Sequence, residues 1–236
     1  MLAVPLLLGV AASRPSPWQL LLAATAVSGY LASATAQAWL RARRRPSFVL
    51  SLLVYGGAFA ALGAVLVMAR PALALSLAVV IPAAAVTLAG ARPGTRRDLA
   101  NSLAQVAIAL VLVPAAAYAS GDAALARVVA ATLIAAGYLV GTVLVVRSVI
   151  RERGSAAFAR LSVGYHGLAF VLATTALPWP FAFVAAGLTA RAVALPILQR
   201  RRAGSPRPLR PIHVGVTEIV ASTILVVVAF VAGFGA

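Results

Sequence analysis

Long apolar runs alternate with clusters of arginine along this chain, and this alternation constrains its fold more than any other feature. Sixteen of the twenty arginines fall in four clusters, and every second apolar run ends in one of them. The clusters are Arg41, Arg43, Arg44 and Arg45; Arg92, Arg96 and Arg97; Arg147, Arg151, Arg153 and Arg160; and Arg200, Arg201, Arg202, Arg207 and Arg210. Arginine-rich alternate loops are typical of proteins that cross an inner membrane several times. The pattern therefore predicts a multi-pass protein of the bacterial cytoplasmic membrane, with these loops in the cytoplasm.

The composition excludes several classes of protein and site. The chain is 63% hydrophobic and only 10% charged, far from the balance of a soluble domain. Its net charge of +16 does not indicate nucleic-acid binding, because the arginines punctuate apolar runs and form no stripe on a soluble surface. With no cysteine, two histidines and four acidic residues, we expect no disulfide, metal ion or cofactor.

The apolar runs have the length of membrane-spanning helices. A bilayer's hydrocarbon core is about 30 Å thick and needs about twenty apolar residues, and helices satisfy their own backbone groups there. The predicted spans are residues 17–40, 47–69, 71–91, 99–119, 124–147, 158–177, 179–197 and 214–234. We therefore predict an all-α, polytopic transmembrane helical bundle, with residues 1–236 as a single transmembrane domain.

The first twelve residues are apolar but reach only about 18 Å as a helix. No positive segment precedes them, as a signal peptide would require. We expect the outer part of a first span that begins upstream of Met1, which gives nine spans, an inside N-terminus and an outside C-terminus. Single cysteines at Thr95 and Ser120 test this orientation: a membrane-impermeant thiol reagent should label position 120 and spare position 95.

Polar residues inside the predicted spans are the best indicators of a site, because a charge at the bilayer centre costs a few kcal/mol. Arg191 lies within the eighth span, and Glu218 about one turn into the ninth. An ion pair that joins these two helices and a ligand site are both consistent with this placement. His166 fits a polar contact between helices.

The end of the sixth span carries two further patterns. Gly137 and Gly141 form a small-xxx-small motif, which lets helices approach closely. Arg147 and Arg151 are four residues apart and share a helix face, while Glu152 points elsewhere if the helix continues. Two guanidinium groups on one face form a clamp for phosphate or carboxylate, although a topology signal alone explains them more simply.

Four segments of the chain resemble the YwiC-like family of bacterial integral membrane proteins. They are Met1 to Gly9; Arg97-Asp98-Leu99-Ala100-Asn101; Tyr138 to Arg153; and Gly215-Val216-Thr217-Glu218-Ile219. Members usually carry histidine, glycine, alanine and tryptophan just before the first segment, so the resemblance also implies a start upstream of Met1. It implies a multi-spanning membrane protein and no established activity.

In span number the chain is also similar, more distantly, to the UbiA-type prenyltransferases. Those enzymes use aspartate-rich motifs near the ends of spans two and six to hold magnesium and a diphosphate. Here the end of the second span has no acid, and Glu152 is the only acid at the end of the sixth. Because magnesium sites recruit carboxylates, we do not expect the metal-dependent chemistry.

Our hypothesis for function is the binding of an anionic amphiphile in a cavity open to the cytoplasmic leaflet. The arginines hold the charged head, while Tyr138 and the apolar helix walls hold the tail. The residues expected at this cavity are Arg97, Asn101, Tyr138, Arg147, Arg151, His166, Arg191 and Glu218. A UbiA-like transferase with degenerate metal motifs, a transporter, and a structural or accessory subunit remain alternatives, and membrane lipids are the only other expected partners.

Overall fold

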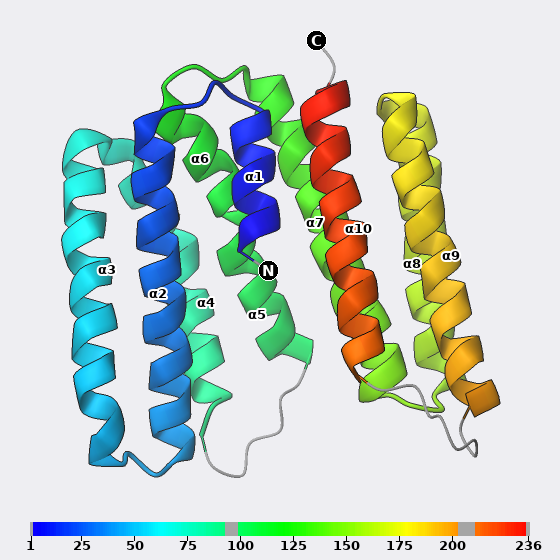
Figure 1. The fold of residues 1–236 in the computed structure, drawn as a ribbon, viewed down its shortest axis with the longest axis horizontal. Coiled ribbons are helices and arrows are strands. Elements are labelled where there is room, and N and C mark those ends of the chain that lie inside the picture. Colours follow the sequence, from blue (N-terminus) through cyan, green and yellow to red (C-terminus); the bar gives the residue numbers. More distant parts are fainter. Residues whose placement is uncertain (1, 93–98, 203–210, 235–236) are drawn as a thin grey trace. The chain divides into compact units, whose positions relative to one another are not determined.

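The computed structural model describes residues 2–92, 99–202 and 211–234, and every secondary-structure element in these ranges is helical (Figure 1). Eight segments are long and apolar enough to cross a membrane, and they coincide with the eight full spans expected from the sequence. The prediction of an all-α polytopic bundle is therefore confirmed, and the chain is a multi-spanning membrane protein. Arg97, position 95 and most of the linker from Arg200 to Pro211 lie outside the described residues.

The helices form two compact units, residues 1–135 and residues 136–236, which we call unit 1 and unit 2. The division falls inside α7 (Leu125–Ile150). Each unit is described by itself below.

In its described residues, unit 1 contains six α-helices before α7 and two short 3-10 segments. They are α1 (Ala3–Ala11), α2 (Pro17–Arg41), η1 (Pro46–Phe48), α3 (Val49–Ala69), η2 (Pro71–Ser76), α4 (Leu77–Ala89), α5 (Leu99–Leu110) and α6 (Leu112–Ser120). The predicted span 99–119 is thus two helices, which part at Val111. Pro114 explains the break, because it has no N–H to donate to the carbonyl of Leu110.

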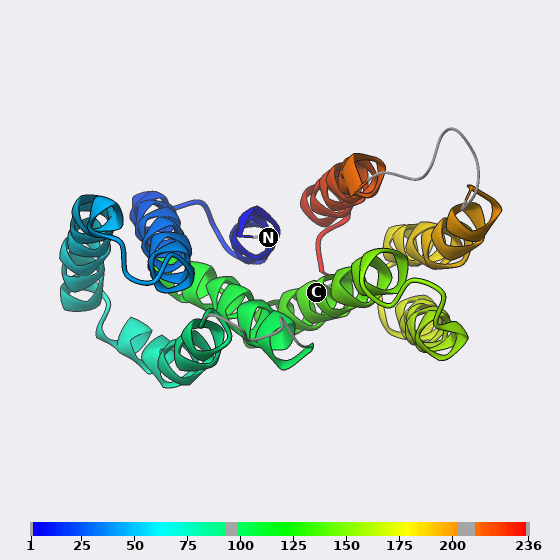
Figure 2. The ribbon, with the colours of Figure 1, turned by 90° about the horizontal axis from the view of Figure 1, so that it is seen from below.

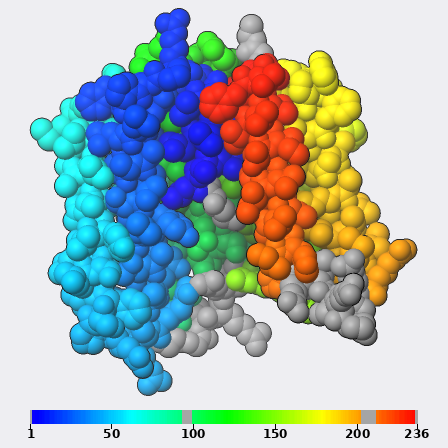
Figure 3. Space-filling view, in the orientation of Figure 1, coloured from blue at the N-terminus to red at the C-terminus, as the bar shows by residue number. Residues whose placement is uncertain are grey.

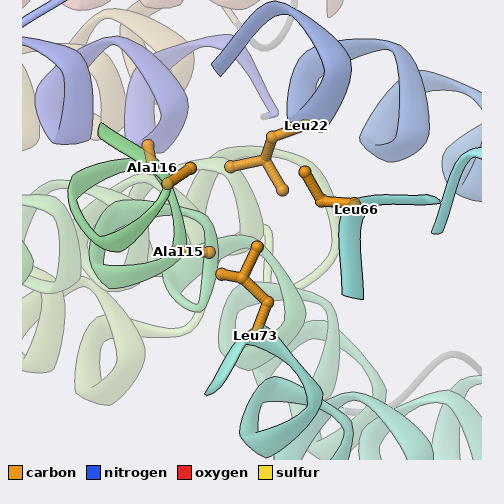
Figure 4. Packing of buried hydrophobic residues seen from close by; sticks show 6 residues of the cluster. Leu22, Leu66, Leu73, Ala115 and Ala116 are labelled. Carbon is orange, nitrogen blue, oxygen red and sulfur yellow. The ribbon is translucent and has the colours of Figure 1, made fainter. Parts of the chain in front are cut away.

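The core of unit 1 forms where α2, α3, η2 and α6 meet. Figure 4 shows Leu22, Leu66 and Leu73 converging on the small residues Ala115 and Ala116 of α6. The nine-residue α1 also packs very closely against α6. A Cβ atom on Gly9 would lie 2.6 Å from the carbonyl oxygen of Val113. Glycine therefore permits this contact.

A capping box fixes the start of α2. The Ser16 side chain accepts from the backbone N–H of Trp18, and the backbone N–H of Ser16 donates to Gln19 Oε1. The Gln19 amide nitrogen in turn donates to Ser13 Oγ and, over 3.1 Å, to the backbone carbonyl of Ala116. This one buried side chain joins the turn after α1, α2 and α6.

Unit 2 consists of the second half of α7, α8 (Ala156–Ala176), α9 (Trp179–Arg202) and α10 (Pro211–Ala232). Helix α9 packs against α8 and also contacts α10, which lies beside it (Figures 2 and 3). The apolar core between α7, α9 and α10 is made by Val145, Val149, Ala192, Leu195 and Val214. The Ser155 side chain caps α8 by accepting from the backbone N–H of Phe158.

Candidate functional site

A charged pair joins two helices of unit 2 inside their membrane-spanning lengths. Arg191 lies near the middle of the 24-residue α9, and Glu218 lies two turns into α10. Arg191 Nη1 is 2.5 Å from Glu218 Oε1, and the two side chains are only 9% and 17% exposed. Of the two alternatives open from the sequence, the ion pair is therefore present.

The second carboxylate oxygen of Glu218 bonds to α7. Its Oε2 accepts from Thr142 Oγ1 at 2.9 Å and lies 3.2 Å from the Tyr138 hydroxyl. Tyr138 and Thr142 are four residues apart, so both side chains lie on one face of α7. Glu218 thus links α7, α9 and α10 through one side chain.

His166 brings α8 to the same polar cluster. Its Nδ1 lies 2.7 Å from the backbone carbonyl of Ser162, and a carbonyl can only accept, so Nδ1 carries a proton. The Thr189 hydroxyl on α9 donates to the backbone carbonyl of His166 at 3.0 Å. The ring lies against Gly141 of α7, the residue next to Thr142. We call Tyr138, Thr142, His166, Arg191 and Glu218 the polar cluster.

The close packing of His166 depends on one glycine of the small-xxx-small motif. A Cβ atom on Gly141 would lie 2.8 Å from His166 Nε2 and 3.4 Å from a ring carbon of Tyr165. A Cβ atom on Gly137 would meet no atom within 4 Å. The motif therefore marks a contact of α7 with α8 that a Cβ atom would obstruct only at Gly141, and the Tyr165 hydroxyl donates to the Gly137 carbonyl at 3.2 Å.

The guanidinium group of Arg191 is only partly satisfied. Its Nη1 donates to Glu218, whereas Nε and Nη2 are buried and have no hydrogen-bond partner. These two nitrogens carry three of the five N–H donors of an arginine. Buried donors of a charged group are costly to leave unbonded, so Arg191 can accept further oxygen atoms.

At the end of α7, Arg147 pairs with Glu152. Helix α7 ends at Ile150, and the chain turns so that Glu152 Oε1 lies 3.1 Å from Arg147 Nη2. The condition that the helix continues is therefore not met, and Glu152 faces Arg147. Arg147 is largely buried and its guanidinium lies over the ring of Phe158, while Arg151 is exposed.

Asn101 belongs to unit 1, where it is buried in α5 with its amide against Gly90. Of the eight residues expected at one cavity, Tyr138, His166, Arg191 and Glu218 come together in unit 2. Thr142 and Thr189 were not predicted. The spacing of Thr142 from Tyr138 was a usable signal, but threonine is too common in membrane helices to be singled out.

Across the described residues, no group of three or more histidine and acidic side chains is placed to hold a metal ion.

An apolar groove of about 400 Å³ lies between α9 and α10. Its lining residues are Trp179, Pro180, Phe183, Val184, Gly187, Ala221, Ile224 and Val228. Along α9, Trp179, Phe183 and Gly187 recur every four residues, and Arg191 is the next position in this row. The groove thus lies toward the start of α9, away from the arginine cluster at the end of this helix.

A second, smaller pocket of about 110 Å³ lies at the arginine-rich ends of α7 and α9 and the start of α8. Ser148, Arg153, Gly154, Ser155, Ala159, Pro196, Gln199 and Arg200 line it. Gly187 and Pro196 are nine residues apart, which places the groove and this pocket on opposite faces of α9.

Comparison with known proteins gives one family match. The family described as YwiC-like protein matches residues 1–117, which include the first two of the four similar segments. The other two segments, and the whole polar cluster, lie beyond the matched residues. No curated protein and no solved structure matches the chain. Over residues 1–117, just under half of its length, the chain is similar to the YwiC-like protein family.

Proposed function

We propose that unit 2 binds an amphiphile with an anionic head, which contacts Arg191 while the tail lies in the groove between α9 and α10. The observation that carries this proposal is the pair of unbonded nitrogens on the buried Arg191. Within a membrane there is little water to satisfy them, so a carboxylate or phosphate oxygen is the group that fits.

The groove supplies the second half of the proposal. Its lining is almost wholly apolar, as a hydrocarbon tail requires, and it ends one helical turn from Arg191 along α9. On α10, Glu218 is three residues from the lining residue Ala221. On both helices, therefore, one member of the ion pair lies about one turn from the groove. Head and tail sites are therefore adjacent and suit one molecule.

The location of the groove changes one detail of the hypothesis drawn from sequence. The sequence-based hypothesis expected a cavity that opens toward the cytoplasmic leaflet, next to the arginine-rich loops. The groove lies instead toward the other end of α9. With arginine-rich loops in the cytoplasm, the proposed tail would lie in the outer half of the membrane.

Two matched variants separate head binding from tail binding. In Arg191→Met with Glu218→Gln the charged pair is removed as a unit, which is tolerated better than breaking it. In Gly187→Leu the groove is filled without any change of charge. The controls are Arg160→Gln, at an exposed arginine of α8, and Gly164→Leu, at a glycine of α8 whose Cβ position is open.

The measurement is native mass spectrometry of the detergent-purified protein after incubation with phosphatidylglycerol or phosphatidylcholine of equal chain length, with and without magnesium. We expect a discrete phosphatidylglycerol adduct in the parent protein and both controls, and at least tenfold less in both test variants. Equal retention of both lipids by all proteins would contradict the proposal. It would favour a structural or accessory subunit, in which the ion pair only joins helices.

A further inference from the structure

We propose that the small pocket at the arginine-rich end of unit 2 is a phosphate-binding site, separate from the polar cluster and independent of the proposed amphiphile site. Two arginines line it, Arg153 and Arg200, and none of its eight lining residues is acidic. The nearby carboxylate of Glu152 is held by Arg147. The pocket therefore carries a positive charge, and no acidic residue in its lining neutralises that charge.

A buried amide supports the same ligand class. Gln199 lines the pocket, is only 8% exposed, and its Nε2 has no hydrogen-bond partner. A buried amide donor without a partner costs free energy, and the oxygen of a bound anion would satisfy it. This unbonded donor distinguishes the pocket from an ordinary arginine-rich surface, where water hydrates every polar group.

The start of α8 adds further donors to the pocket. The first turn of a helix has backbone N–H groups without partners within the helix, and the partial positive charge there attracts anions. Ser155, the capping residue of α8, lines the pocket and bonds the N–H of Phe158 at 3.2 Å. Its hydroxyl proton remains available for an anion oxygen.

The volume limits the size of the bound group. At about 30 Å³ for each water-sized group, a pocket of about 110 Å³ holds three or four such groups. A phosphate with its oxygen atoms is of this size, whereas an acyl chain is not. The phosphate is that of a lipid head or of a free phosphate or phosphomonoester, and the test below distinguishes them.

The experiment compares adjacent arginines of one helix. Arg200→Gln removes a lining charge, and Arg201→Gln removes an exposed charge that does not line the pocket. Gln199→Leu replaces the buried donor with an apolar side chain of similar size. Because the pocket wall stays filled, a loss of binding in this variant is not explained by misfolding. Binding of inorganic phosphate to the full chain in neutral detergent is measured by isothermal titration calorimetry. Binding of phosphatidic acid is measured in nanodiscs, against phosphatidylcholine nanodiscs.

We expect Arg200→Gln and Gln199→Leu to raise the dissociation constant about tenfold, which is about 1.4 kcal/mol, and Arg201→Gln to change it less than twofold. Binding of inorganic phosphate would identify a soluble phosphate as the ligand, and binding only of phosphatidic acid would identify a lipid head. Equal weakening by Arg200→Gln and Arg201→Gln would reduce the effect to general electrostatics and overturn the proposal. So would the absence of binding in both formats.

Discussion

Neutralising Glu218 should destabilise unit 2 more than any other single polar substitution in it. The Glu218→Gln side chain keeps an oxygen for Thr142 but withdraws the negative charge from Arg191, whose Nη1 lies 2.5 Å from the carboxylate. Two unit charges about 4 Å apart interact by about 4 kcal/mol at an effective dielectric constant of about 20. Breaking a buried pair from one side costs about 3–5 kcal/mol. Hydrogen bonds between membrane helices tend to the lower end of such ranges, so we expect a loss of about 3 kcal/mol.

The assay is a double-mutant cycle with Glu218→Gln, Arg191→Gln and the double variant. Unfolding is followed in mixed micelles of mild detergent and sodium dodecyl sulfate, with tryptophan fluorescence as the signal. The double variant should be more stable than the sum of the single losses predicts, by about 2 kcal/mol, because it leaves no unpaired charge.

The pair of Arg147 and Glu152 is the matched control. Its glutamate is 39% exposed, so the corresponding cycle should give a coupling below about 1 kcal/mol. The reasoning would be refuted if the free-energy losses of the two single variants, Arg191→Gln and Glu218→Gln, sum to the loss of the double variant within about 0.5 kcal/mol. The two side chains would then act independently.

Three glycine substitutions test close helix packing, two in unit 2 and one in unit 1. Gly141→Ala should cost about 1–3 kcal/mol in unfolding free energy because its Cβ atom would lie 2.8 Å from His166 Nε2, while Gly137→Ala, with no atom within 4 Å, should cost almost nothing. Equal effects of the two in the same unfolding assay would contradict the described contact. Gly9→Ala should lower the melting temperature of the purified protein, because its Cβ atom would lie 2.6 Å from the carbonyl oxygen of Val113. An unchanged melting temperature would show that α1 does not hold to α6.

The spans were predictable because their signal is local. A run such as residues 47–69 is apolar over the thickness of a bilayer, so its length and composition alone define the helix. The structure gives Pro46–Ala69 for this span. Finer features depend on single backbone groups. Pro114 was visible in the sequence, but its consequence, the division of one span into α5 and α6, was not, because Pro82 and Pro196 lie inside helices that continue past them.

The candidate site was predictable only in part, because it depends on contacts between distant residues. Arg191 and Glu218 stand out as charges within apolar runs, and they are 27 residues apart in sequence. Nothing in the sequence shows that Thr142 completes the bonding of Glu218 over a separation of 76 residues. For Arg147 the expected direction of Glu152 was conditional on a continuing helix, and the turn after Ile150 instead brings Glu152 to Arg147.

The order of Arg191 and Glu218 along the chain has a consequence for biogenesis. During synthesis the ribosome adds Arg191 first and Glu218 27 residues later, which takes roughly 1–5 s at about 5–20 residues per second. In that interval α9 carries a charge that disfavours its insertion by about 2.5–3.5 kcal/mol, with no counter-ion yet made. Membrane integration of α9 should therefore be provisional until α10 emerges, and a ribosome paused between the two helices would leave α9 open to slippage or to capture by an insertion chaperone.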